Sequence, residues 1–368
     1  MDLVDSIVLV SPRYPPYIGG VETHVSQMAK RARKFFDHVS VITTDPSWHL
    51  GHIQKTADGL TIHRIRSFAP SENYHFPSPI ELFAQLKESR PQVLHIHALH
   101  DLPGPVAGFM DSQSSLIFTP HYVGRINSRL GRVLFKAYRP LVHKLIKKVP
   151  RIICTSRFEA RLMAATFPDS SAKIELIPNG VDREFQEKYP WREPAEPRIL
   201  YAGRLERYKN VDKILRAVAQ LQPKYEDLKT TIVGRGPFKP ELLKLAASLK
   251  VNGGVEWLEG LTRDELFELY SSATAVIVPS ESESMGVAAA EAIGVGAPTI
   301  VADASGLAEF VEEGLAQPIE PPVTYVKLAQ KIEEVLEDPK RFSPTGMKSP
   351  LIKTWDEVAE QTYRSCAS

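Results

Sequence analysis

Short apolar runs recur through the first half of the chain, and segments with a helical spacing of apolar residues separate most of them. A short apolar run between turn residues is typical of a buried strand. Strands that alternate with helices indicate a parallel sheet covered by helices. The expected strands of this α/β domain are 6–10, 38–43, 93–97, 115–119, 151–155 and 173–177.

A second series of the same kind predicts a second α/β domain. Its expected strands are 198–202, 229–233, 255–258, 274–278 and 298–301. Residues 187–197 lie between the two series, and their proline and charged residues without apolar periodicity are typical of a linker. Near the end of the chain, 354–364 has the amphipathic spacing of a closing helix.

Composition narrows the classes of function. The 368 residues hold 45 basic and 44 acidic side chains, a net charge of +1 that argues against nucleic acid as a partner. Cys154 and Cys366 have neither metal-ligand nor disulfide spacing, which favours a reducing cytoplasm. Without a signal-like N-terminus or an apolar run near ~20 residues, we expect neither secretion by this route nor a membrane span.

The loop that follows the expected strand 274–278 carries two carboxylates. Glu283 lies just before an expected helix and Glu291 about one turn inside it. The first exposed N–H groups of this helix fall near Met285, Gly286 and Val287, which is an anion-binding geometry. The pattern predicts a site for a phosphorylated ligand; the alternative is a solvated acidic turn followed by a core helix.

Two further loops follow strands of the second domain. Gly203, Arg204 and Lys209 come after the strand 198–202, and an Arg fork with a Lys point charge can neutralise a diphosphate without a metal. A solvated basic turn is the alternative. Gly234 begins a glycine loop after the strand 229–233 that is suited to line a nucleoside pocket.

In the first domain, Gly19 and Gly20 precede the first helix and allow close approach of a ligand, or form only a tight turn. They lack the third glycine of the dinucleotide fingerprint, so a nicotinamide cofactor is not supported. His121 follows a strand end, where its side chain can reach a cleft. His95, His97 and His100 lack a carboxylate or thiolate partner, and we expect no metal there.

Together these motifs resemble the retaining glycosyltransferases of family 4, which have the GT-B fold, over essentially the whole chain. The matching segments are Gly19-Gly20, 119–121, 177–182, Gly203-Arg204 with Lys209, 233–237, and Glu283 with Glu291. The resemblance implies two Rossmann-like doubly wound parallel-sheet domains that face each other across a cleft. The implied division is an acceptor domain 1–186, a linker 187–197, a nucleotide-sugar domain 198–350, and a helix in 351–368 that crosses back to the first domain.

The resemblance also implies metal-independent transfer of a sugar, with retention, from a nucleotide-diphosphate sugar to a glycan or lipid-linked acceptor, without a cofactor. It assigns Arg204, Lys209 and the amides of 285–287 to the diphosphate, Glu291 to the ribose, and Glu283 and His121 to the donor sugar, with Gly20 closing on the diphosphate. The implied catalytic residues are Glu283, His121, Arg204 and Lys209. The implied donor-binding residues are Gly19, Gly20, Gly203, Gly234, Met285, Gly286, Val287 and Glu291.

Two departures from the family pattern leave the donor base and sugar open. Ser284-Met285 stands where Gly and Phe are frequent, and Arg235 stands where an acidic residue is frequent. Two rival functions remain at this point: a GT-B-type epimerase or phosphorylase, and a non-catalytic nucleotide-sugar-binding protein. The four residues Arg204, Lys209, Glu283 and Glu291 argue against the second.

The segment from Arg125 to Lys148 carries eight Lys or Arg residues and no acidic residue, interleaved with apolar ones. Such a pattern predicts docking on an anionic membrane surface, here the cytoplasmic face, or else a core-facing helix with a basic outer side. We expect Pro140 to divide the segment into two helices.

Overall fold

A computed structural model describes residues 4–47, 49, 52–57, 59–71, 74–124, 129–251 and 253–366. By its internal contacts the chain divides into a first unit, Met1–Pro178 with Trp355–Ser368, and a second unit, Asn179–Thr354. The second unit thus includes 187–197, the segment with the composition of a linker. Trp191 anchors that segment: its backbone N–H donates to Val295 O at 2.7 Å and its Nε1 donates to Ala273 O at 2.8 Å.

The sheet of the first unit has the order β3-β4-β2-β1-β6-β7-β8-β9, with β5 paired to β4. Neighbours from β4 to β9 run parallel, whereas β3 and β5 run antiparallel to β4. The strands are β1 Val4–Val10, β2 Phe36–Asp45, β3 Ile53–Lys55, β4 Thr61–Ser71, β5 Tyr74–Pro77, β6 Val93–His97, β7 Ser115–Thr119, β8 Arg151–Cys154 and β9 Ile174–Leu176.

Helices cover both faces of this sheet because successive strand residues point to opposite sides. Val8 and Val10 belong to the core beneath α3 and α4, while Ile7 and Leu9 belong to the core beneath α1 and α13. The helices are α1 Gly20–Ala32, α2 Pro79–Ser89, α3 Pro103–Met110, α4 Arg129–Lys148, α5 Arg157–Thr166 and α13 Trp355–Tyr363.

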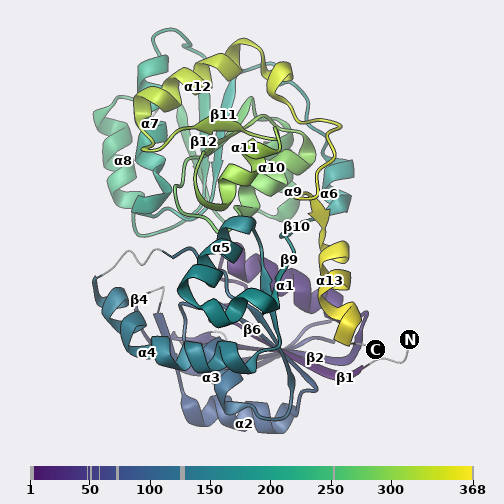
Figure 1. The fold of residues 1–368 in the computed structure, drawn as a ribbon. Helices are drawn as coiled ribbons and strands as arrows, with labels where there is room; N and C mark the ends of the chain where they lie inside the picture. Colours follow the sequence, from purple (N-terminus) through teal and green to yellow (C-terminus); the bar gives the residue numbers. More distant parts are fainter. Residues whose placement is uncertain are drawn as a thin grey trace. The chain divides into compact units, whose positions relative to one another are not determined.

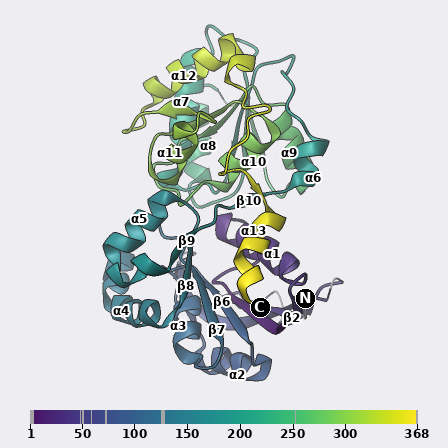
Figure 2. The same ribbon diagram turned by 45° about the vertical axis from the view of Figure 1, so that its right-hand side comes forward.

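The C-terminal helix α13 packs on the first unit, as the resemblance to family 4 implies. It lies beside α1 in both Figure 1 and Figure 2. Lys34 Nζ lies 2.6 Å from Asp356 Oδ1, and the hydroxyl of Tyr363 lies 3.0 Å from Nδ1 of His95 in the sheet. The helix therefore completes a core that the first 178 residues leave open.

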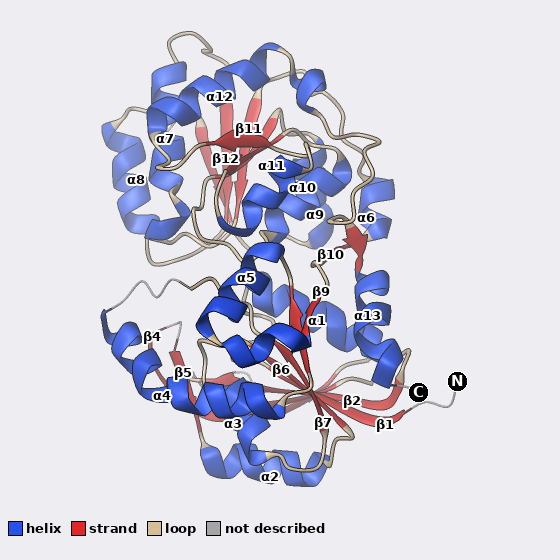
Figure 3. Cartoon of the chain, in the orientation of Figure 1, coloured by secondary structure: helices blue, strands red, loops and turns tan. Residues whose placement is uncertain are grey.

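The sheet of the second unit is wholly parallel, with the order β13-β12-β11-β14-β15-β16, and helices flank it (Figure 3). Its strands are β11 Arg198–Ala202, β12 Lys229–Val233, β13 Val255–Leu258, β14 Ala275–Val278, β15 Thr299–Ala302 and β16 Gln317–Ile319. Its helices are α6 Arg183–Lys188, α7 Val211–Leu221, α8 Lys239–Ser248, α9 Arg263–Ser271, α10 Val287–Val295, α11 Ala308–Glu312 and α12 Tyr325–Glu337.

Smaller elements complete the chain. β10 Gly180–Val181 pairs in parallel with β17 Lys353–Thr354, which brings the two ends of the second unit together. The 3-10 helices are Pro168–Lys173, Arg207–Lys209, Ser305–Leu307, Pro339–Phe342 and Arg364–Cys366. No helix in the described ranges has both the length and the apolar character needed to cross a bilayer.

Both sheets are doubly wound, which confirms the predicted fold class. In each, the strand order reverses beside the first strand of the unit, between β1 and β6 and between β11 and β14. Ligands of such sheets bind outside the carboxyl ends of the strands at this reversal. Ligand-binding residues are therefore expected in the loops after Val10, His97, Ala202 and Val278.

One expectation about the basic segment is wrong. Residues 129–148 form a single helix, α4, with Pro140 inside it, rather than two helices. Proline removes one N–H and leaves the carbonyl of Lys136 without its helical partner. Lys136 and Pro140 are both exposed, so water can hydrate that carbonyl and the helix continues. Residues 125–128, the start of the segment, lie outside the described residues.

Candidate active site

An ion pair joins two of the predicted catalytic residues at the reversal of the second sheet. Lys209 Nζ donates to Glu283 Oε1, with 16% and 17% of the two side chains exposed. Lys209 lies in the loop after β11, and Glu283 in the loop after β14. Asn210 holds the same two loops together, because its Nδ2 donates to Pro279 O at 2.9 Å.

The surroundings of Lys209 keep its ammonium charged. Burial alone would lower the pKa of Lys209, but the negative charge of Glu283, which also accepts a hydrogen bond from the ammonium, raises it overall. Burial in turn raises the pKa of the nearby Tyr208 and Tyr201, so they stay neutral at physiological pH. A compact, charged ammonium in this position can bind an anion that enters the site.

Arg204 lies in the same loop as Lys209 and forms an ion pair with Glu206. The backbone beneath it is tightly packed. Gly234, at a φ of +142°, approaches Gly203 so closely that a Cβ at residue 234 would lie 1.9 Å from Gly203 O. The two predicted glycine loops therefore meet, and only glycine at residue 234 permits that approach.

The loop after β14 turns sharply into α10, as predicted. Gly286 precedes the helix with a φ of +94°, in the left-handed region that favours glycine. Gly306 N donates to Glu283 O and Glu283 N donates to Ser305 Oγ, both at 3.0 Å. The first intrahelical bond of α10 runs from Ala290 N to Gly286 O, so the N–H groups before it are available to an anion.

Met285 has a larger role than its sequence position suggests. Its side chain is 2% exposed and packs in the core with Leu307 and Phe310. Its sulfur also accepts a hydrogen bond from Asn179 N at 3.0 Å. The side chain therefore holds the turn between β14 and α10 in place.

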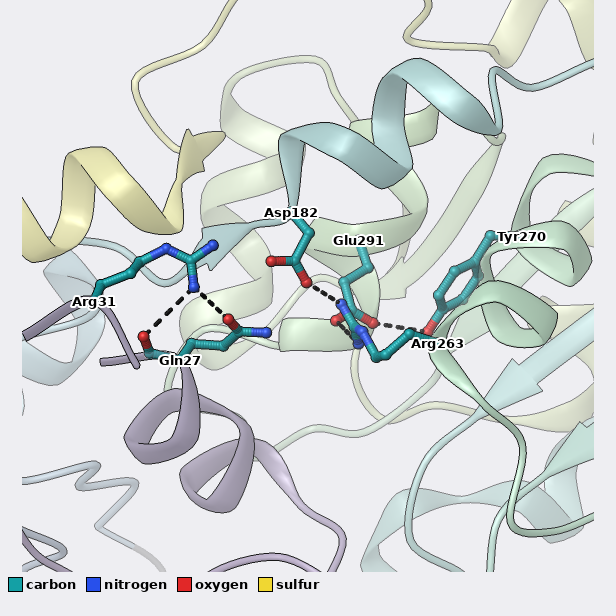
Figure 4. Close-up of polar contacts among 6 residues, drawn as sticks. All are labelled: Gln27, Arg31, Asp182, Arg263, Tyr270 and Glu291. Carbon is teal, nitrogen blue, oxygen red and sulfur yellow. Dashed lines mark hydrogen bonds and ion pairs between the residues drawn. The ribbon is translucent and has the colours of Figure 1, made fainter. Parts of the chain in front are cut away.

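Glu291 lies at the centre of a polar cluster in Figure 4. Its Oε1 accepts from Arg263 Nη1 at 2.6 Å, and its Oε2 accepts from the hydroxyl of Tyr270 at 3.3 Å. Arg263 Nη2 in turn donates to Asp182 Oδ2 at 2.8 Å. Two carboxylates thus flank one guanidinium.

Charge neutralisation explains why Glu291 can be 3% exposed. Burial lowers the pKa of Arg263, but the charges and hydrogen bonds of Glu291 and Asp182 raise it overall, so the guanidinium stays charged. Burial raises the pKa of Tyr270, which remains a donor toward Glu291. Sequence reasoning gave no role to Arg263 or Tyr270, and quoted Asp182 only as part of a motif.

In the first unit, His121 follows β7 and takes a φ of +49°. Its ring lies 4.9 Å from that of His24 and 5.7 Å from that of His97, between ring centroids. Among the described residues, Nε2 of His121 and both ring nitrogens of His97 are buried without a hydrogen-bond partner. Burial, with help from neighbouring histidines, lowers the pKa of His97 and His121, so both are neutral at pH 7.

The histidines that the sequence groups together do not all meet. His95 has structural partners, with Nε2 at 2.8 Å from Thr119 Oγ1 and Nδ1 at 3.0 Å from Tyr363. His100 packs elsewhere, against Tyr122. Instead His24, which the sequence did not single out, joins His97 and His121, and their nearest ring nitrogens lie within 4.8 Å of one another. Neutral imidazoles in this arrangement are able to hold a transition metal.

The Gly19-Gly20 turn stands at the start of α1, near the reversal of the first sheet. α1 begins at Gly20, with Gly19 in extended backbone at its N-cap. Thr23 N donates to Gly19 O at 2.9 Å, and Arg13 Nε lies 2.8 Å from Glu22 Oε1. The buried carboxylate of Glu22 itself lies against this turn, because a Cβ at residue 19 would be 2.3 Å from its Oε2.

Two family models match the chain. The family model described as Glycosyl transferases group 1 matches residues 182–348. The model described as Glycosyltransferase Family 4 matches residues 18–185. The two models meet near the boundary between the structural units, and between them they span most of the chain.

An uncharacterized glycosyltransferase of Methanocaldococcus jannaschii is 25% identical, over 97% of this chain and 96% of that protein. The glycogen synthase of Mycobacterium tuberculosis is 27% identical, over 97% and 93%. Among solved structures, sucrose-phosphate synthase from Thermosynechococcus elongatus has a TM-score of 0.78 at 20% identity, over 98% and 99% of the chains. The Anabaena protein HepE, solved with UDP and glucose, has a TM-score of 0.71 at 16% identity, over 98% and 99%. The chain belongs to the glycosyltransferases that combine the Family 4 and group 1 regions, and it has their GT-B fold.

Proposed function

We propose that this glycosyltransferase moves a sugar from a nucleotide-diphosphate sugar to a glycan or lipid-linked acceptor, with retention and without a metal or cofactor. The observation that carries the proposal is the Lys209–Glu283 ion pair: Arg204 lies in the same loop as Lys209, and α10 begins shortly after Glu283. The groups proposed to bind phosphate and the carboxylate proposed for the sugar lie in loops at the reversal of the sheet.

The chemistry of the donor explains this combination. Breaking the bond between sugar and phosphate builds negative charge on the leaving diphosphate and positive charge at the anomeric carbon. Lys209, Arg204 and the N–H groups of residues 285–287 stabilise the first charge, and they stabilise the transition state more than the ground state. Glu283 supports the second charge. Because these cations and amides supply the neutralisation, the reaction needs no divalent ion.

Retention is proposed to follow from attack on the same face of the sugar, with the leaving phosphate accepting the proton of the acceptor. A covalent intermediate on Glu283 is the weaker alternative, because its carboxylate already accepts from Lys209 and is a poor nucleophile in that state. Proton NMR of the first product formed distinguishes retention from inversion. An inverted anomeric centre would overturn this step.

The nucleoside is proposed to bind beside Glu291, whose carboxylate accepts from ribose hydroxyls, with Gly203 and Gly234 shaping the loops. HepE was solved with UDP and glucose, which supports testing UDP-sugars first. The roles of Gly19, Gly20 and His121, which belong to the first unit, stay predictions from the resemblance to family 4. The cytoplasmic location expected from Cys154 and Cys366 also stays a prediction.

A turnover screen over UDP-, GDP- and ADP-sugars tests the proposal. We expect turnover of at least one donor, and a loss of a hundredfold or more for Lys209→Ala and Glu283→Gln. Lys244→Ala, an exposed lysine of α8, is the matched control and should retain full activity. Turnover that survives both site substitutions would overturn the assignment.

The same screen decides between the rival functions. A phosphorylase would release the sugar with inorganic phosphate as acceptor, and an epimerase would convert one nucleotide sugar into another. A sensor would bind a nucleotide sugar without any turnover. Each of these results would replace the transfer reaction proposed here.

We further propose that α4 docks the first unit on an anionic membrane surface. Val133 is 66% exposed, and Lys136 and Lys144 are exposed on the same helix. Other cations of α4 have partners within the protein: Arg139 Nη2 donates to Thr166 O at 3.1 Å, and Lys148 Nζ donates to Gly108 O at 3.0 Å. Docking therefore depends on a subset of the basic residues.

Flotation with vesicles of phosphatidylglycerol and phosphatidylcholine tests the docking. Lys136→Gln with Lys144→Gln should reduce binding about thirtyfold, at roughly 1 kcal/mol for each of the two cations. Lys244→Gln with Lys250→Gln, two exposed lysines of the second unit, is the control pair. Unchanged binding of the α4 variant would refute the docking proposal. Donor turnover by this variant is expected to equal that of the wild type.

A further inference from the structure

The first unit contains an apolar pocket of about 240 Å³ between β5, α4 and the residues that lead into α3. Among the side chains that line it are Phe76, His100, Leu102, Leu134, Ala137 and Tyr138. α3 and α4 lie side by side in Figure 1, and Figure 3 shows β5 near them. Since a water molecule takes up about 30 Å³ of the liquid, several carbon-sized groups fit in this space.

The lining includes the polar residues His75, His100 and Tyr138, of which only His100 has no hydrogen-bond partner among the described residues. Both of its ring nitrogens are buried without a partner among the described residues. Burial lowers the pKa of His100 to about 4, so the ring is neutral and offers one donor and one acceptor. Buried polar atoms without partners are costly and rare. A ligand with a hydroxyl or carbonyl oxygen would satisfy them.

The pocket lies beyond the carboxyl end of β6, and ligands of such folds bind at the carboxyl ends of the strands. His100 follows the end of β6, and its ring is 5.1 Å from that of Tyr122, measured between centroids. Tyr122 is the neighbour of His121 in the chain, beyond the end of β7. A molecule in the pocket therefore borders the loop that carries the predicted sugar-binding histidine.

The mouth of the pocket combines apolar and basic character. Ala137 is exposed where it lines the pocket, and Lys136 is exposed beside it in the sequence. An apolar chain that carries an anionic group fits this pattern, with the chain inside the pocket and the charge near the lysine.

We propose that this pocket binds the hydrocarbon segment of the acceptor, and that the acceptor is an anionic amphiphile whose hydroxyl or carbonyl oxygen bonds His100. The proposal rests on the glycosyl transfer argued above and narrows its acceptor from glycans in general to lipid-linked molecules. Membrane docking would place α4 on a bilayer surface, whereas this proposal places one hydrocarbon chain inside the protein.

Fluorescence titration with cis-parinaric acid, an anionic polyene chain, tests the pocket in the absence of vesicles. We expect saturable binding by the full-length protein and at least a tenfold loss of affinity in Ala137→Trp, whose indole fills the mouth. Val133→Trp adds the same side chain on the same helix outside the pocket, and should stay within twofold of the wild type. Leu134→Trp provides a second filled pocket in case Ala137→Trp does not fold.

Absence of saturable binding, or equal affinities in the wild type and the filled variants, would refute the proposal that the pocket binds a hydrocarbon chain. Equal losses in Ala137→Trp and Val133→Trp would place the probe on the helix surface and overturn it as well. Donor turnover with water, measured on the same samples, is expected to be unchanged in the filled variants. No donor turnover in the wild type would instead overturn the glycosyl transfer, and with it the acceptor role.

A transfer assay with alkyl glycosides tests the acceptor role itself. Octyl glycosides should have at least a tenfold lower KM than methyl glycosides of the same sugar in the wild type, because burying several methylenes favours binding. Ala137→Trp should remove most of that difference, and Val133→Trp should keep it. Equal KM values for the two chain lengths in the wild type would contradict the role.

Discussion

Arg263 and Glu291 form a short ion pair between two helices of the second unit, with 2.6 Å from Nη1 to Oε1. Arg263 is the first residue of α9, and Glu291 lies inside α10. The contact orients the carboxylate that is proposed to hold the ribose, and Asp182 supports the guanidinium from the other side. We therefore propose that Arg263 is a positioning residue for nucleotide binding.

Ribose analogues test this pair. The wild type should bind its preferred nucleoside diphosphate about tenfold more tightly than the 2′-deoxy or 3′-deoxy analogue, because one hydrogen bond to a charged group is lost. Glu291→Ala should bind all three with similar, weaker affinity, and Arg263→Gln should show a reduced preference. Titration calorimetry measures the affinities. A full preference for ribose in Glu291→Ala would show that this carboxylate does not contact the hydroxyls.

The Lys209–Glu283 pair should be coupled in stability as well as in function. Lys209→Met and Glu283→Gln should each lower the free energy of unfolding by about 3 kcal/mol, because each leaves a buried charge without its partner. The double substitution should cost clearly less than the two single effects together. Urea unfolding of the wild type, the two single variants and the double variant measures these free energies.

The exposed pair of Lys224 and Glu333 provides the control for this set of variants. Its coupling should be too small to measure, because solvent screens surface ion pairs. Additive effects at Lys209 and Glu283 would contradict a direct interaction between them.

Gly234 should tolerate no side chain. Gly234→Ala places a Cβ 1.9 Å from Gly203 O at a φ of +142°, so the two loops must separate. We expect a loss of stability above 2 kcal/mol and weaker nucleotide binding. Gly253→Ala is the matched control, since nothing lies within 4 Å of a Cβ there. Equal melting temperatures for the two variants would refute the close contact.

Acid should destabilise the first unit through its buried histidines. His100 has a pKa lowered to about 4 by burial, so between pH 6.5 and 4 the unfolded state binds a proton that the folded state does not. Stability is then lost as the pH falls, by up to about 1.4 kcal/mol per pH unit. Glu159 opposes this effect, because burial raises its pKa to about 7.

Comparison with His100→Leu isolates the histidine from Glu159. The wild type should lose stability relative to this variant between pH 6.5 and pH 4, and the difference should be constant above pH 7.5. Urea unfolding across this range provides the curve. A difference that does not change with pH would show that His100 titrates equally in both states.

The sequence predicted the buried strands well, because strands of a parallel sheet that are covered on both faces are continuous apolar runs. β6, β7, β11, β12 and β13 have the expected bounds. β4 was missed, although it has 11 residues. Its buried Ile62 and Ile65 are separated by His63 and Arg64, which break both the apolar run and a regular alternation.

Motifs singled out Lys209 and Glu283 because both lie in loops that follow strands, and Glu291 because it lies in the helix that follows one of these loops. Arg263 was missed because its partners, Glu291 and Asp182, are 28 and 81 positions away in the chain. His24 was missed for a similar reason, since it joins His97 and His121 only when α1 packs against the sheet. Contacts of this kind depend on tertiary packing, which no local pattern contains.

The central claim is that cations and helix amides, rather than a metal, hold the diphosphate of the donor. Titration calorimetry in excess EDTA, with a nucleoside diphosphate and the matching monophosphate, tests it most directly. We predict that the wild type prefers the diphosphate at least tenfold, and that Lys209→Ala loses most of this preference. Equal affinities for the two nucleotides in the wild type, or binding that appears only after Mg²⁺ is added, would contradict the account.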